Sequence, residues 1–84
     1  MRLKTMRAST PEMLARMLRD RRRQLGLTQA ELADLCGLTQ QTISAVEHRL
    51  RVSSVDTLWR LFQGLKLEAF VQPVPDLSKD EEAW

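Results

Sequence analysis

The chain has 84 residues, of which 43% are hydrophobic and 29% are charged, with one cysteine and one histidine. This length suits one domain with a modest core, and no apolar run is long enough to span a bilayer. A single cysteine excludes an internal disulfide, and one histidine adds no metal-ligand cluster. We therefore expect a cytoplasmic protein with no membrane partner, no metal and no other cofactor.

The net charge of +2 hides an uneven distribution along the chain. Residues 1–26 carry eight basic residues against two acidic ones, whereas residues 76–84 carry four acidic residues against one lysine. The basic end suits a polyanion such as nucleic acid, and the acidic end suits a different partner. Residues 1–9 show little periodicity and no apolar signal-peptide core, which predicts a flexible basic N-terminus.

A first helix is predicted from residue 10 or 11 to about Leu25. The run Ser-Thr-Pro-Glu at residues 9–12 combines a cap candidate, a proline in the first turn and an acid near the positive end of the helix dipole. Gly26 is expected to end the helix. The expected buried residues are Leu14, Met17, Leu18 and Leu25.

Two short helices joined by a tight turn are predicted between Thr28 and Glu47. Thr28 and Glu31 have the spacing of a capping box, in which each side chain bonds the backbone amide of the other residue. Gly37 follows where a helix stop favours a left-handed residue, and Thr39 is placed to cap the second helix. This pattern indicates a helix-turn-helix unit. The expected core residues are Leu32, Ala33, Cys36, Ile43 and Val46.

A further helix is predicted to open with Ser53 and Asp56, which have the spacing of a second capping box, and to end at Leu65. Trp59 lies beside the apolar stripe and fits either the rim of the core or a subunit interface. Gly64 indicates either close packing or fraying at the helix end. The expected core residues are Leu58, Leu61, Phe62 and Leu65.

Residues 67–73 change to a period of two, which predicts a β-strand. A single strand leaves its backbone groups unpaired, so we expect it to pair with its own copy across a two-fold axis. The pairing residues are Leu67, Glu68, Ala69, Phe70, Val71 and Gln72. Residues 74–84 are predicted to be a disordered acidic tail, in which Trp84 is either incidental or an anchor for a partner.

The predicted fold class is therefore all-α. It comprises a helix-turn-helix DNA-binding domain of about four helices over residues 10–66, plus one C-terminal β-strand that pairs across a homodimer.

The residues that carry a family resemblance are Leu27, Thr28, Gln29, Leu32, Ala33, Gly37, Leu38, residues 39–44 and Glu47. With them, residues 11–65 resemble the XRE family of Cro-type helix-turn-helix proteins, which includes lambdoid phage repressors. The resemblance covers about two-thirds of the chain and implies a lambda-repressor-like fold that binds double-stranded DNA. In phage repressors an arginine on the first helix meets a glutamate that ends the recognition helix. Arg22 and Glu47 occupy these positions, which implies a structural ion pair.

The continuation Leu-Lys-Leu-Glu-Ala-Phe-Val at residues 65–71 and the run Glu-Ala-Trp at residues 82–84 resemble HipB-type antitoxins. In that group C-terminal strands pair between subunits, and a tryptophan-terminated tail is implicated in contacts with the kinase toxin HipA. The resemblance implies an antitoxin and autorepressor of a HipBA-type operon, which binds an inverted-repeat operator as a homodimer and neutralises a HipA-like Ser/Thr kinase. It assigns toxin binding to Trp84.

Glutamine can form two hydrogen bonds with adenine, so Gln40 and Gln41 are the strongest candidates for reading bases. Thr39 stands where HipB proteins have a lysine, and Ala45 stands where phage repressors place another polar reader. The DNA sequence recognised should therefore differ from both. The full base-reading set is Thr39, Gln40, Gln41, Ser44 and Ala45. The expected phosphate-binding set is Thr28, Gln29, Thr42, Arg49 and Arg51.

Other function classes fit the sequence less well. An enzyme is not expected, because the chain has no phosphate loop, no nucleophile with a supporting base and no paired carboxylates in a cleft, and no small-molecule substrate is implied. A stand-alone XRE-family repressor with no toxin partner shares every residue through Val71 and differs only in giving the tail no role. A pure protein-interaction module would leave Gln40, Gln41 and the basic terminus without a purpose.

Overall fold

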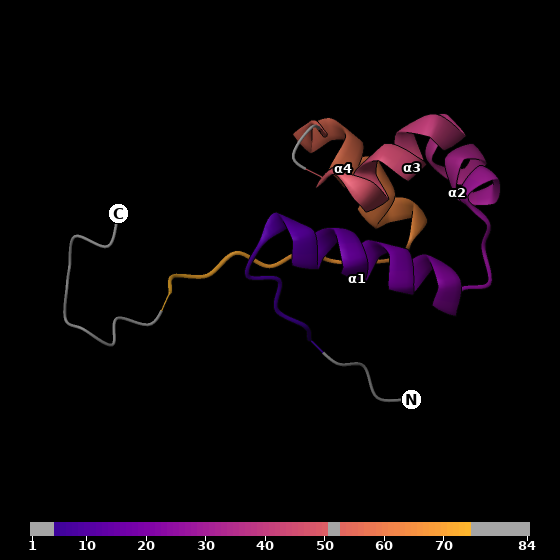
Figure 1. The fold of residues 1–84 in the computed structure, drawn as a ribbon. Coiled ribbons are helices and arrows are strands. Elements are labelled where there is room, and N and C mark those ends of the chain that lie inside the picture. The colour runs from indigo at the N-terminus through magenta and orange to yellow at the C-terminus, as the bar shows by residue number, and fades with distance from the viewer. Residues whose placement is uncertain (1–4, 51–52, 75–84) are drawn as a thin grey trace.

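Four helices make up the described part of the computed structural model, which covers residues 5–50 and 53–74 (Figure 1). They are α1 (Pro11–Gln24), α2 (Gln29–Cys36), α3 (Gln40–His48) and α4 (Val55–Gly64). α2 packs against both α3 and α4, and α1 packs against α3. The all-α prediction is confirmed, and none of the described helices is long and apolar enough to cross a membrane.

Side-chain caps fix where the first three helices begin. Thr10 caps α1 and Thr39 caps α3, each through a hydroxyl that accepts a first-turn amide at 3.1 Å. The predicted capping box of α2 is present: the Thr28 hydroxyl accepts the Glu31 amide at 3.0 Å, and the Glu31 carboxylate accepts the Thr28 amide at 2.8 Å. Gly37 ends α2 with a φ of 69°, as its position predicts. These bonds satisfy groups that helix ends leave unpaired.

The predicted capping box at Ser53 and Asp56 is wrong by one residue. Ser54 caps α4, and its hydroxyl accepts the Thr57 amide at 3.1 Å. Ser53 instead donates its amide to the Leu50 carbonyl at 2.9 Å, which ties it to the preceding turn. Two adjacent serines offer equivalent hydroxyls, so the backbone of the loop decides which of them caps the helix.

The core lies where the four helices meet. The buried apolar residues are Ala15, Leu18, Leu32, Ala33, Cys36, Ile43, Val46, Leu50, Leu61 and Leu65. The predicted core of α2 and α3 is confirmed, and at α4 Leu58 and Phe62 are half-buried against it. The prediction that Met17 belongs to the buried stripe of α1 is wrong, because Met17 is half-buried outside this cluster. The stripe is centred instead on Ala15 and Leu18, which lie three residues apart on one face.

Close packing explains the glycine at the end of α4. A Cβ at Gly64 would overlap the Cys36 sulfur and would lie 3.4 Å from a methyl group of Leu32. α2 and α4 therefore cross with only a hydrogen at this position, and fraying is not the reason for the glycine. Burial raises the pKa of the Cys36 thiol, and a hydrogen bond with the Gly64 backbone partly offsets the rise. Cys36 is thus a core residue, as predicted.

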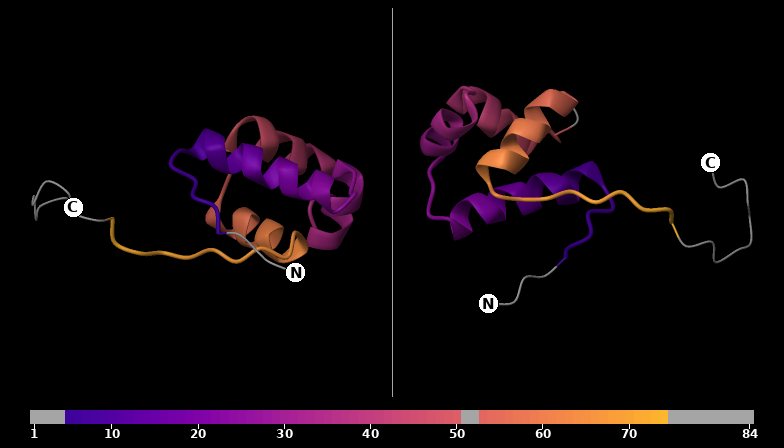
Figure 2. Two further views of the ribbon diagram at one scale, coloured as in Figure 1. Left: turned by 90° about the horizontal axis from the view of Figure 1, so that it is seen from below. Right: turned by 180° about the vertical axis from the view of Figure 1, so that it is seen from behind.

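The chain leaves α4 through a turn that α1 helps to hold. α4 ends at Gly64, one residue before the predicted end, and Leu65 is its C-cap. The Leu65 carbonyl accepts a hydrogen bond from Arg21 Nε at 2.9 Å. Lys66 has a left-handed backbone with a φ of 57°, and the Leu67 amide donates to the Phe62 carbonyl at 2.8 Å. Beyond this turn the chain runs extended and projects past the helices (Figure 2).

Residues 67–74 form no strand in the described chain. Phe70 is 73% exposed and Val71 is 100% exposed, so apolar side chains on both faces of this segment lack cover. The predicted strand requires a second copy of the chain, and it stays a prediction. Trp59 is 59% exposed on α4 and is not a core residue. The predicted tail beyond its first residue, including Trp84, lies outside the described residues.

A buried ion pair joins α1 to the end of α3. The Arg22 guanidinium donates to both carboxylate oxygens of Glu47, at 2.7 and 3.2 Å, and to the Leu27 carbonyl at 2.8 Å. Gln29, at the start of α2, donates its side-chain amide to the same carboxylate at 3.1 Å. The Glu47 side chain is only 4% exposed. The expected pair is present, and it links three helices through charge-assisted bonds.

Glu47→Ala is expected to lower the free energy of unfolding by about 3 kcal/mol, because it leaves the buried Arg22 guanidinium without its carboxylate. The control is Asp56→Ala, which breaks the exposed Asp56–Arg60 pair on α4 and should cost about 0.3–0.5 kcal/mol. Urea unfolding followed by circular dichroism measures both values. Equal losses in the two variants would contradict a structural role for Glu47.

Candidate nucleic-acid interface

α3 exposes the side chains that are predicted to read bases. Gln40, Gln41 and Ala45 are exposed, and Ser44 is half-buried. Ser44 lies four residues after Gln40 and three after Gln41, so these side chains share one face of the helix. The opposite side of α3 is buried in the core, and the helix therefore presents this face from a fixed position.

Two predicted DNA-binding threonines contact each other at the start of α3. The hydroxyl oxygens of Thr39 and Thr42 lie 2.9 Å apart, and the Thr39 hydroxyl also accepts the Thr42 amide. These hydroxyls hold the first turn of the helix. Contacts of Thr39 and Thr42 with DNA stay predictions.

Thr28 and Gln29, which the sequence predicts as phosphate ligands, both make internal contacts. The amide and the hydroxyl of Thr28 are used in the capping box with Glu31. The Gln29 side chain donates to Glu47, because this buried carboxylate needs more donors than Arg22 supplies to it. The structure thus gives both residues a positioning role, and phosphate binding by their side chains stays a prediction.

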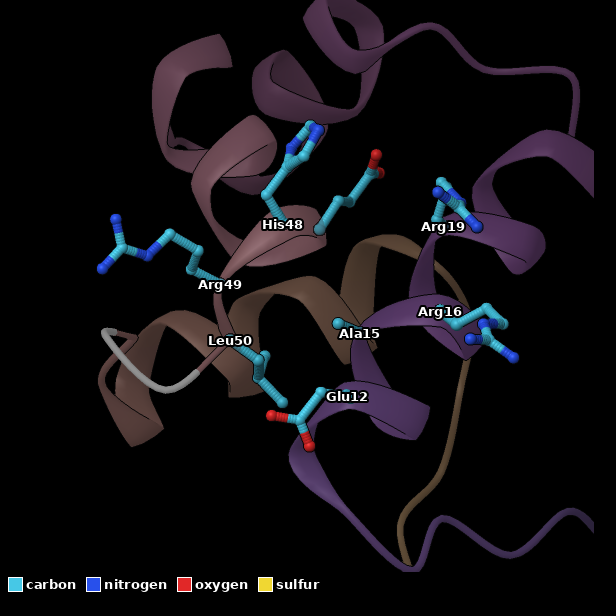
Figure 3. A pocket seen from close by; sticks show the side chains of 8 residues that line it. Glu12, Ala15, Arg16, Arg19, His48, Arg49 and Leu50 are labelled. Atoms are coloured by element: carbon cyan, nitrogen blue, oxygen red, sulfur yellow. The ribbon is translucent and has the colours of Figure 1, made fainter.

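A cavity of about 370 Å³ lies between α1 and the end of α3 (Figure 3). Arg16 and Arg19 line it from α1, and His48 and Arg49 line it from the end of α3; we call it the basic groove. Arg49, a predicted phosphate ligand, is exposed, and Arg51 lies outside the described residues. Arg16 and Arg19 had no predicted role, although their three-residue spacing places them on one face of α1.

Arg19, which lines the basic groove, carries an unsatisfied hydrogen-bond donor. Its Nε is buried and has no hydrogen-bond acceptor among the residues that the structure describes. A buried donor without a partner costs about 1–3 kcal/mol, so an acceptor that entered the groove would be stabilised. An anion is the expected kind of ligand here, because Arg16, Arg19 and Arg49 line the groove and a guanidinium group donates hydrogen bonds and accepts none.

The sequence matches the family model for helix-turn-helix proteins over residues 18–70. This range begins within α1, includes the helix-turn-helix pair and α4, and covers more than half of the chain. A comparison with curated proteins found no match.

Solved structures of HipB share this fold. A chain of the HipA–HipB–O2–O3 complex superposes with a TM-score of 0.79 at 30% identity, and the match covers 84% of this chain and 100% of that one. A complex of a HipB variant with an O2 20mer gives a TM-score of 0.80 at 30% identity, covering 86% of this chain and 100% of that one. The helix-turn-helix pair, the family match over residues 18–70 and these likenesses agree. The chain therefore belongs to the XRE-type helix-turn-helix family, among the HipB-type proteins.

Proposed function

We propose that this protein is a sequence-specific DNA-binding antitoxin and the autorepressor of a HipBA-type toxin–antitoxin operon. The observation that carries the proposal is the exposed α3 face with Gln40 and Gln41. The buried Arg22–Glu47 pair joins α3 to α1 and so holds this face in place. A helix presented in this way enters the major groove, where glutamine can bond the amino group and the ring nitrogen of adenine. Relatives of the same fold are solved in complexes with O2 and O4 20mers, which adds support.

The proposed protein binds its operator as a homodimer. Support comes from residues 67–72. The described residues neither cover the exposed side chains of Phe70 and Val71 nor pair with the backbone of these two residues in a sheet. Pairing of two such segments across a two-fold axis would place two α3 helices about one helical turn apart, ~34 Å, or at a multiple of it. The operator would then be an inverted repeat.

The proposed toxin partner is a HipA-like Ser/Thr kinase. One support is the solved complex in which a HipB relative occurs with HipA. The other is the composition of the tail, in which an acidic stretch carries Trp84. An indole on a polar leash suits a pocket that basic residues surround. The alternative is a stand-alone repressor, and a HipA-like kinase in the adjacent reading frame would favour the antitoxin.

Gln40→Ala is expected to weaken binding to the preferred duplex by about 1–3 kcal/mol and to relax the choice of one base pair. The preferred duplex is the one that the wild-type protein selects from a random pool, and fluorescence anisotropy measures the affinities. Gln63→Ala, an exposed glutamine on α4, serves as the matched control and should bind normally. Unchanged affinity and base preference in Gln40→Ala would refute base reading by this side chain.

A chain that ends at Lys66 is expected to be a monomer with much weaker DNA binding, since two linked contacts bind far better than one. Sedimentation measures the oligomeric state. Ala69→Pro keeps Leu67 against the core and removes one backbone donor from the predicted strand, so it should weaken the dimer without unfolding the helices. If the shortened chain stayed dimeric, the interface would have to lie elsewhere, with α4 and Trp59 as the next candidates.

Trp84→Ala is expected to weaken binding to the proposed HipA-like kinase of the adjacent reading frame, because it removes the side chain with the largest contact area in the tail. Dimerisation and DNA binding should stay normal. Titration of the purified kinase with each variant measures the effect, and Leu77→Ala controls for loss of a smaller apolar side chain from the same tail. Equal kinase affinity in the Trp84→Ala variant and the wild type would leave the tail without its proposed role.

A further inference from the structure

Arg16 and Arg19, which line the basic groove from α1, have no part in the function proposed above. We propose that the basic groove binds a backbone phosphate of the DNA beside the bases that α3 reads, so that α1 contributes directly to the DNA interface. This inference rests on the proposed DNA-binding function and adds a second kind of contact to it. The ligand class is a phosphodiester of double-stranded DNA.

The groove lies on the reading side of α3. His48, one of its lining residues, comes four residues after Ser44 and seven after Gln41, so it continues the row of side chains predicted to read bases. The His48 ring is held by its Nδ1, which lies 2.8 Å from the Ser44 carbonyl oxygen. A duplex lying along this row reaches the end of α3 where the groove begins.

The charge of the lining favours an anion. The charged side chains are Arg16, Arg19, Arg49, Glu12 and Glu47. Glu47 is already paired with Arg22 through two hydrogen bonds, and Glu12 is the other carboxylate of the lining, so three arginines line the groove against two carboxylates. Guanidinium groups match the geometry of phosphate oxygens, which makes phosphate the fitting anion.

Arg19 adds a geometric reason to the electrostatic one. Its Nε is buried without an acceptor among the described residues, and Arg19 is one of the residues that line the cavity of about 370 Å³. Figure 3 shows Arg16 and Arg19 on successive turns of α1, across the cavity from His48 on α3. A phosphodiester oxygen between these elements would accept the unused Nε hydrogen and lie within the field of both arginines. Residues of α1 and α3 would thus clamp the same stretch of DNA backbone.

The test measures DNA affinity against salt for the full-length chain and for Arg16→Ala, Arg19→Ala and the double variant. The duplexes are the one selected by the wild-type protein and a scrambled version of it. The double variant loses the phosphate contact, so it is expected to reduce the slope of log affinity against log salt by about one, and each single variant by less. All three variants are expected to weaken both duplexes by a similar factor. Arg60→Ala, which removes the same charge from exposed α4 and does not line the groove, should leave the slope unchanged.

Three outcomes would overturn the proposal: slopes equal to the wild-type slope, a slope change of the same size in Arg60→Ala, or weakening of the selected duplex alone. Thermal melts ensure that the compared variants are folded, and the double variant Arg16→Lys/Arg19→Lys should keep the wild-type slope because it keeps both charges. A wild-type protein that selects no duplex would refute the proposed function itself. A wild-type protein that selects one, with unaltered slopes in the alanine variants, would refute only the groove.

Discussion

The Glu47 carboxylate is almost excluded from water, and the arrangement of the first three helices depends on satisfying it. It stands at the end of α3 and takes hydrogen bonds from Arg22 on α1 and from Gln29 at the start of α2. Apolar contacts alone tolerate small slides between helices, whereas a buried charge is stable only when its donors are in place. The orientation of the face that carries Gln40 is therefore set by this polar junction as well as by the core.

The parts of the fold that could be predicted from sequence are those with local causes. A capping box acts between Thr28 and Glu31, three residues apart, and Gly37 ends α2 through its own backbone conformation, so both signals are complete within a few residues. The start of α4 was misplaced because Ser53 and Ser54 carry the same hydroxyl, and only the path of the preceding loop distinguishes them.

The candidate site divides in the same way. The exposure of Gln40 and Gln41 follows from helical periodicity, which the sequence contains. Two other features depend on how the first three helices pack together: the contact of the Gln29 side chain with Glu47, and the cavity that Arg19 lines. No local sequence pattern encodes this packing. The strand at residues 67–73 is a third case, because its hydrogen-bond partners would belong to another molecule.

The turn after α4 sets the direction in which the chain departs. Arg21 holds the Leu65 carbonyl, Lys66 reverses the backbone, and the Leu67 amide returns to Phe62. None of these bonds involves a second copy, so the joint is already stiff in the free protomer, and association has little conformational entropy left to remove there. In the proposed dimer this joint would fix the orientation of each helical domain relative to the paired strands. The spacing of the two α3 helices would then be fixed, and the dimer would select DNA with one spacing of half-sites. DNA whose half-sites are separated by a few base pairs more or less would have to bend or twist to fit.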